Sequence, residues 1–212
     1  MSNRIAFFSD GSDLIEFFGL EDSGKAIYES HYNIARGHHI PVIERGDEEY
    51  EITRLRWGKD FEKEADPPEV LSPDGIRKLE NDAKDRAVIP ISGFYIWKRD
   101  GNSDHPFFVR KIDNSLLYIA GYTFTDKENA FTYVEMLMME SNTLIQPVTE
   151  KMPLILKMDH AMEWLKHDIE ASQIQNKAQS EFLITELTVH RVSKELNDLS
   201  KNDASLIQPI PK

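Results

Sequence analysis

The sequence contains no cysteine, and this absence removes several kinds of chemistry at once. Disulfide bonds, thiolate metal ligands and cysteine nucleophiles are all excluded. Glycine is also scarce, with 10 residues among 212, and no glycine-rich phosphate loop or dinucleotide fingerprint is present. The seven histidines show no metal-ligand spacing. We therefore expect no metal and no cofactor.

Long hydrophobic runs and positive charge are missing too. No stretch approaches the roughly 18 apolar residues needed to cross a bilayer, and the N-terminal segment lacks the order of a secretory signal. We expect a cytoplasmic protein with no membrane partner, and a monomer. Lys and Arg number 25 against 37 Asp and Glu, a formal charge of −12. Such a surface repels polyanions on average, so contact with nucleic acid requires a local basic groove.

What the sequence does contain is a series of strand patterns. The richest runs from Arg86 to Val109, with a break at Gly93 and a turn at Gly101 and Asn102, and predicts two strands of a central antiparallel sheet. Further strands are predicted at 5–8, 40–43, 50–57, 116–124, 131–139 and 182–192. One helix is predicted to be capped by Ser12 and ended by Gly19, and another to be capped by Asp159 and to continue to about Gln179. Residues 58–85 are predicted to be a long polar loop that holds only a short helical pattern around Ile76 and Leu79. Many strands and few helices predict an α+β fold, residues 1–212 as a single domain, with a curved, mostly antiparallel sheet or barrel and a few flanking helices.

Seven segments, taken together, carry a resemblance to one known family. They are MSNRIA at 1–6, which is similar to the family's MCGRFA; HYNIARG at 31–37, to RYNVAPG; RLRWG at 54–58, to MRWG; AVIPISGFYIWK at 87–98, to CLVPADGFYEWK; VTEKMPLIL at 148–156, to IHDRMPVIL; VHRVS at 189–193, to HPVS; and LIQPI at 206–210, to LIQP. The matches occur in the same order and span nearly the whole chain. The sequence thus resembles the SRAP family, the SOS response-associated peptidases that form covalent links to abasic sites in single-stranded DNA.

The resemblance implies an SRAP-like fold and a role in the DNA damage response, and it assigns catalytic positions. In the family, removal of the initiator methionine exposes a cysteine whose amine and thiol close on the opened sugar as a thiazolidine, and Ser2 occupies that position here. The family's glutamate in GFYEW, which transfers protons, corresponds to Ile96, and the histidine of HDRMP corresponds to Thr149. All three positions have lost the side chain to which the family's chemistry is assigned.

The resemblance also implies single-stranded or abasic DNA as a partner. Arg4, Asn33 and His190 are the candidate DNA-binding residues that remain in matching motifs. The family's NARxET motif does not occur within 58–85, where Arg77 is the candidate for its arginine.

These observations leave three hypotheses and do not decide whether the chain is an enzyme. The first is a degenerate abasic-site sensor that contacts DNA through a local groove, with its covalent chemistry lost or weakened. The alternative is a non-catalytic interaction module that no longer binds nucleic acid, as the charge of −12 suggests. A hydrolase that uses Ser2 as nucleophile and its own amine as base ranks last, because no oxyanion or acid partner can be named for it.

Overall fold

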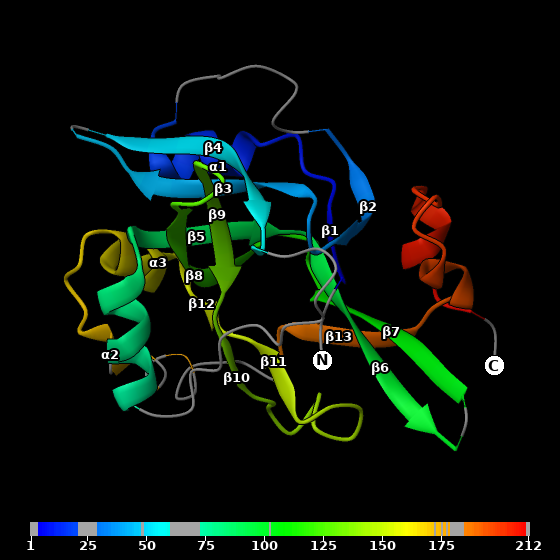
Figure 1. The fold of residues 1–212 in the computed structure, drawn as a ribbon. Helices are drawn as coiled ribbons and strands as arrows, with labels where there is room; N and C mark the ends of the chain where they lie inside the picture. The colour runs from blue at the N-terminus through cyan, green and yellow to red at the C-terminus, as the bar shows by residue number, and fades with distance from the viewer. Residues whose placement is uncertain are drawn as a thin grey trace.

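The computed structural model describes residues 4–20, 29–47, 49–59, 73–101, 103–171, 173–174, 176, 178 and 185–210, with the backbone alone for 73–77. Its elements, in chain order, are β1 (Arg4–Phe7), α1 (Ser12–Phe18), β2 (His31–Ala35), β3 (His39–Arg45), β4 (Tyr50–Trp57), α2 (Pro73–Asp82), β5 (Asp85–Ile91), β6 (Gly93–Asp100), β7 (Ser103–Lys111), β8 (Leu117–Asp126), β9 (Phe131–Met136), β10 (Met138–Glu140), β11 (Lys151–Pro153), β12 (Ile155–Leu156), α3 (Met158–Leu165), β13 (Leu187–Arg191) and the 3-10 helices η2 (Lys194–Asn197) and η3 (Ala204–Ile207). Strands dominate and a few helices flank them, as predicted (Figure 1).

Two main sheets carry the fold. One has five strands in the order β13-β7-β6-β1-β2, and the other has six in the order β12-β8-β5-β3-β4-β9. Strand β8 pairs with β9 as well as with β5, so the second sheet curls and closes on itself. All its described pairings are antiparallel except that between β4 and β9. The predicted curved, mostly antiparallel sheet or barrel is thereby confirmed. The extent of the domain, predicted as residues 1–212, stays a prediction.

The chain changes sheets at Ser92, between β5 and β6. The Ser92 amide donates to the carbonyl of Ala6, and the Ser92 hydroxyl accepts from the amide of Phe8, both at 2.8 Å. A Cβ on the following Gly93 would lie 2.3 Å from a ring carbon of Phe108. Glycine therefore lets the chain pass close to β7 at this corner. The prediction of two strands within 86–109 was wrong, because this corner divides the segment into three.

The five-stranded sheet buries both of its faces. Phe94 and Ile96 on β6 lie in the main hydrophobic core, whereas Tyr95 between them lies in a second cluster on the opposite face. That second cluster consists of Ala6, Tyr95, Phe108, Val192, Leu196 and Ile207, with Phe8, Tyr32 and Trp97 partly buried against it. The C-terminal segment supplies part of its cover through Val192, Leu196 and Ile207, so Ile207 anchors the end of the chain against the sheet.

Several predicted boundaries move. Ser12 is the first residue of α1 rather than its cap, since Gly11 takes the cap position with a φ of 81°. In the same way, Lys157 precedes α3 at the cap, and α3 ends at Leu165. The described residues at 171, 173–174, 176 and 178 are helical again, and Gln179 lies outside the described residues. The predicted strand at 131–139 divides into β9 and β10 at Leu137, where hydrogen bonds to two other segments interrupt it.

The strand predicted at 182–192 forms only in part within the described chain. Strand β13 covers Leu187–Arg191, and residues 181–184 lie outside the described residues. In the part of the chain that the structure describes, no helix is long and apolar enough to cross a membrane.

Candidate functional site

Strand β1 begins at Arg4, which two neighbouring strands flank. Arg4 pairs with Tyr95 on β6 and with Ala35 on β2. Its side chain is partly buried, and this burial lowers the pKa of the guanidinium. Ser2 lies outside the described residues, and the covalent chain alone limits its Cα to about 7 Å from that of Arg4. Arg4 is the first described residue after Ser2 along the chain.

Ile96, the position that matches the family's glutamate, is part of the hydrophobic core. Its side chain has an exposed fraction of 0% and belongs to the main cluster. Because successive strand residues point to opposite faces, Ile96 faces away from the side on which Tyr95 and Arg4 lie. An aliphatic side chain suits this apolar position and cannot carry a proton.

A row of side chains crosses the five-stranded sheet on the face opposite to Ile96. Arg4 pairs with Tyr95, Tyr95 with Phe108, and Phe108 with His190. The ring centroids of Tyr95 and Phe108 are 4.8 Å apart. The Tyr95 hydroxyl donates to the carbonyl of Tyr32 at 2.6 Å, and burial raises the pKa of this phenol. The middle of the row is thus packed, with Arg4 at one end.

Asn33 and His190 hold the C-terminal segment on this same face. The Asn33 side-chain nitrogen lies 3.0 to 3.2 Å from three carbonyl oxygens of segment 196–201. The His190 Nε2 lies 2.8 Å from the carbonyl oxygen of Ile207. Both candidate residues therefore have structural partners, and their contact with DNA stays a prediction.

The remaining candidates come from other parts of the fold. Thr149 is partly buried in the turn before β11, where its amide donates to the carbonyl of Ile145 at 3.2 Å. Arg77 belongs to α2, for which only the backbone is described at this position. Of the described site residues, Arg4, Asn33, Ile96 and His190 belong to the five-stranded sheet, with Ile96 on the opposite face from Arg4.

Four basic side chains form a series of electrostatic neighbours beside β1, from Arg4 to His38, His31 and Arg54, and the sequence analysis identified only the first of them. They are Arg4, His31 on β2, His38 in the turn between β2 and β3, and Arg54 on β4. The ring centroids of His31 and His38 are 5.4 Å apart. We call this group the basic cluster.

The charges of the basic cluster act on its two histidines. Burial lowers the pKa of His31, the positive charges of His38 and Arg54 lower it further, and the carboxylate of Glu29 raises it. Burial likewise lowers the pKa of His38, with added repulsion from Arg4 and His39. An anion placed among these groups relieves the repulsion, so the cluster favours a bound phosphate or carboxylate. Sequence inspection missed it because its members meet only through strand pairing.

A buried ion pair holds the turn that carries His38. Two guanidinium nitrogens of Arg36 donate to the two carboxylate oxygens of Glu135 on β9, each at 2.7 Å. Gly58 has a φ of 87°, and a Cβ there would lie 2.6 Å from the Arg36 guanidinium. The glycine of the RLRWG segment thus makes room for this arginine. Arg36 and Glu135 are 99 residues apart in the sequence, so the pair could not be predicted from spacing.

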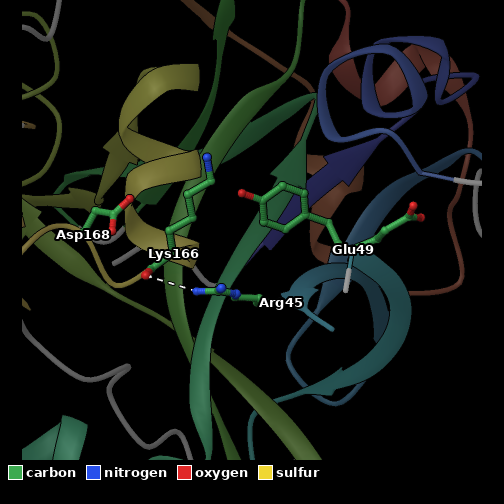
Figure 2. Close-up of a pocket in the computed structure, with 5 residues that line it drawn as sticks. Arg45, Glu49, Lys166 and Asp168 are labelled. Atoms are coloured by element: carbon green, nitrogen blue, oxygen red, sulfur yellow. Dashed lines mark hydrogen bonds between the residues drawn. The ribbon is translucent and has the colours of Figure 1, made fainter. Parts of the chain in front are cut away.

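A shallow pocket of about 280 Å³ lies elsewhere, and Figure 2 shows its lining. It is lined by Arg45, Glu49, Tyr50, Lys166 and Asp168. The Arg45 guanidinium donates to the carbonyl of Lys166 at 3.3 Å (Figure 2). Arg45 and His39 are the two ends of β3, about 20 Å apart at the usual rise of a strand. The pocket is therefore separate from the basic cluster.

The described residues limit the chemistry of the site. They include no group of three or more His, Asp or Glu side chains placed to hold a metal ion. The basic cluster offers positive charge and two imidazoles that can exchange protons. Anion binding is the function for which these groups are suited.

Comparisons with known proteins agree with the motifs. A sequence model of the SOS response associated peptidase (SRAP) family matches residues 80–199. The chain is 22% identical to the abasic site processing protein YedK of Escherichia coli, with 84% of each chain covered. It is 25% identical to the abasic site processing protein YoqW of Bacillus subtilis, covering 98% of this chain and 99% of that protein.

Solved structures show the same fold. A protein from Bacteroides thetaiotaomicron superimposes with a TM-score of 0.76 at 17% identity, covering 99% of this chain and all of the other. A phage-related protein from Bordetella bronchiseptica gives a TM-score of 0.68 at 18% identity, covering 91% of this chain and 94% of the other. Because the family match spans more than half of the chain, the protein belongs to the SOS response associated peptidase family.

Proposed function

We propose that this protein is a cytoplasmic monomer that binds abasic or single-stranded DNA beside the start of β1, with the covalent chemistry of the family lost or weakened. The observation that carries the proposal is the basic cluster, which concentrates positive charge two residues from Ser2 in a chain whose formal charge is −12. Its relatives are named abasic site processing proteins, which supports DNA as the anion.

The proposed roles follow the positions of the side chains. Arg4 contacts phosphate directly. For Arg77, where only the backbone is described, a second phosphate contact is proposed from the motif comparison alone. Asn33 and His190 support the DNA-binding surface through the C-terminal segment that they hold.

The proposed weakness of the chemistry has a physical reason. An α-amine has an unperturbed pKa of about 7.7 to 8.0, so the amine of Ser2, once the methionine is removed, is partly neutral near pH 7 and can attack an aldehyde. Loss of water then gives an imine. A serine hydroxyl closes a far less stable ring on that imine than a thiol does, and neither Ile96 nor Thr149 can transfer the protons that the steps require. The imine therefore hydrolyses readily.

A crosslinking assay tests the proposal. The protein is incubated with single-stranded DNA that contains one abasic site, and adducts are separated on a denaturing gel with and without borohydride, which reduces an imine to a stable amine. We expect no heat-stable adduct without reductant and at most a faint one with it. The variant with Ser2→Cys, Ile96→Glu and Thr149→His should give a higher adduct yield. A robust adduct of the unmodified protein without borohydride would contradict the weakened chemistry.

The second candidate function is an interaction module that no longer binds nucleic acid. The charge of −12 favours it, as does the burial of Ile96 in the core. A salt series separates the two functions, because phosphate binding weakens steeply as salt rises. Absence of binding at low salt by both the unmodified protein and the triple variant would favour the interaction module.

A further inference from the structure

A strip of arginine and aromatic side chains, three of them partly exposed and one buried, lies next to the basic cluster and has no part in the chemistry described above. Strands β4 and β9 run side by side, with Arg56 paired to Tyr133 (Figure 1). Tyr133 pairs in turn with Phe124 on β8, and Arg56 pairs with His39 on its other side. We call Arg56, Phe124, Phe131 and Tyr133 the aromatic strip. At about 4.8 Å between strands, the row from His39 to Phe124 spans about 14 Å.

The rings of the aromatic strip already stack on one another and on a cation. Tyr133 stacks on Phe124 with ring centroids 5.4 Å apart and planes 20° apart. Phe131 lies 6.0 Å from Tyr133, and the Arg56 guanidinium lies 5.4 Å from the centre of the Phe131 ring. Phe131 and Tyr133 remain partly exposed. The strip therefore combines two partly exposed rings with a planar cation that lies over one of them.

Charge on this part of the surface favours an anionic ligand. Two carboxylates beside the strip are paired with cations, Glu135 with Arg36 and Asp126 with Lys59 at 3.7 Å, whereas Glu128 in the turn before Phe131 is exposed. The Asn129 side chain also donates to Asp126 and lowers the pKa of that carboxyl. By contrast, the Nε of Arg56 is buried without a hydrogen-bond partner among the described residues. At the other end of the row, His39 is exposed and adjoins the basic cluster.

We propose that the aromatic strip is a second contact surface for single-stranded nucleic acid, on which unpaired bases stack against Phe131 and Tyr133 while Arg56 contacts the backbone. Stacking platforms beside basic grooves bind single strands in this way without sequence preference. This assignment rests on the proposed DNA-binding function and extends it. A DNA strand that passes from the basic cluster over His39 reaches Arg56 next, because these two residues are paired.

Binding measurements with two matched probes test the strip. One probe is a labelled oligothymidylate of about a dozen nucleotides, and the other is a base-free oligomer of equal length built from unreactive tetrahydrofuran phosphates. Phe131→Leu should weaken oligothymidylate binding by at least about fivefold, since stacking on one base contributes that much or more. The same variant should leave binding of the base-free oligomer unchanged. Phe17→Leu on α1, whose ring is 47% exposed, is the matched control and should change neither affinity.

The role of Arg56 is tested by the salt dependence of probe binding. Arg56→Gln should weaken binding of both probes and lower the slope of log affinity against log salt by about one, because one phosphate contact is lost. Arg56→Lys should restore the slope. Thermal unfolding of every variant verifies that it is folded at the temperature of the assay.

A photocrosslink on the unmodified protein avoids reliance on variants. Oligonucleotides with 5-iododeoxyuridine should crosslink to the tryptic peptide 128–151, with fragmentation placing the adduct on Phe131 or Tyr133. Crosslinks confined to other peptides, or equal oligothymidylate affinity for Phe131→Leu and the unmodified protein, would overturn the strip while leaving the proposed function intact. Equal losses on both probes would identify a surface for polyanions in general, which also overturns base stacking. No binding of either probe by the unmodified protein at low salt would reject the strip and the proposed function together.

Discussion

Ile96 occupies a fully buried position in the main core. Ile96→Glu places a carboxylate there, and we expect it to lower the free energy of unfolding at pH 7 by about 2–4 kcal/mol. Burial raises the pKa of such a carboxyl in the folded state only. The loss should therefore be largest near neutral pH and shrink as the pH falls towards about 4.3, where the unfolded state is protonated as well.

Urea unfolding at several pH values measures this effect, with Ile96→Met as the control of similar volume, expected to cost less than about 1.5 kcal/mol. Unchanged stability of Ile96→Glu at pH 7 would mean that the position is wet. The same measurement sets the conditions under which the triple variant of the crosslinking assay is folded.

The two histidines of the basic cluster make the stability of the protein depend on pH in the direction opposite to that of Ile96→Glu. The pKa values of His31 and His38 are lowered in the folded protein by burial and by neighbouring cations. The unfolded chain, with a histidine pKa of about 6.5, therefore binds more protons below that pH. The stability that these groups contribute is present above about pH 6.5 and is lost as the pH falls below it.

We expect the urea concentration at the unfolding midpoint to be lower at pH 5.5 than at pH 7.5. The difference should be smaller in the variant with His31→Gln and His38→Gln. DNA should bind more tightly at pH 5.5 than at pH 7.5, because phosphate restores the charged imidazoles and binding takes up protons. DNA binding that is independent of pH in this range would show that DNA does not bind at the basic cluster.

At the scale of elements, the Arg36–Glu135 ion pair joins the β2–β3 turn to β9. Both side chains are largely buried, with exposed fractions of 11% and 10%. Removing one partner leaves the other charge buried and unpaired, so Glu135→Gln should lower the free energy of unfolding by about 2–4 kcal/mol. Replacing both residues with methionine should cost less than the sum of the two single replacements, as a double-mutant cycle in urea would show. Additive losses would mean that the two side chains do not interact in solution.

The elements also explain why several motifs occur where they do. Gly58 admits the Arg36 guanidinium, Gly93 lets β6 pass β7, and Ile207 seals the outer face of the five-stranded sheet. Asn33 and His190 fasten the segment that carries Ile207. These motif residues position the surface around β1. Their structural contacts explain their presence without a direct role in chemistry.

At the scale of the whole molecule, the formal charge of −12 affects both the stability of the protein and its affinity for DNA. Repulsion among the acidic groups destabilises the compact state, and salt screens it. Raising sodium chloride from about 0.05 to 0.5 M should therefore increase the melting temperature by about 2–4 °C, the shift expected for about 1 kcal/mol in a chain of this size. DNA affinity should fall over the same range because counterion release weakens phosphate binding. Calorimetry and fluorescence anisotropy in matched buffers measure both responses, and a parallel decrease of both would contradict this account.

The sequence alone determined the fold class, the β4 strand at 50–57, the glycine that ends α1 and the family, through seven motifs in a fixed order. These features are local, because alternation of apolar residues and turn-forming glycines act between near neighbours in the chain. Only the tertiary structure decided that Ser92 divides 86–109 between two sheets and that Leu137 breaks the strand at 131–139. Each of these depends on hydrogen bonds to segments far away in the sequence.

The same distinction applies to the candidate site. Arg4 was found in a motif, but His31, His38 and Arg54 became its neighbours only through the pairing of β1 with β2 and of β3 with β4. The Arg36–Glu135 pair and the aromatic strip likewise join strands whose register no single segment specifies. The sequence of a strand determines which face each side chain occupies, whereas long-range pairing decides which side chains of different strands share that face. The charge and the ring stacking of the candidate site depend on this pairing.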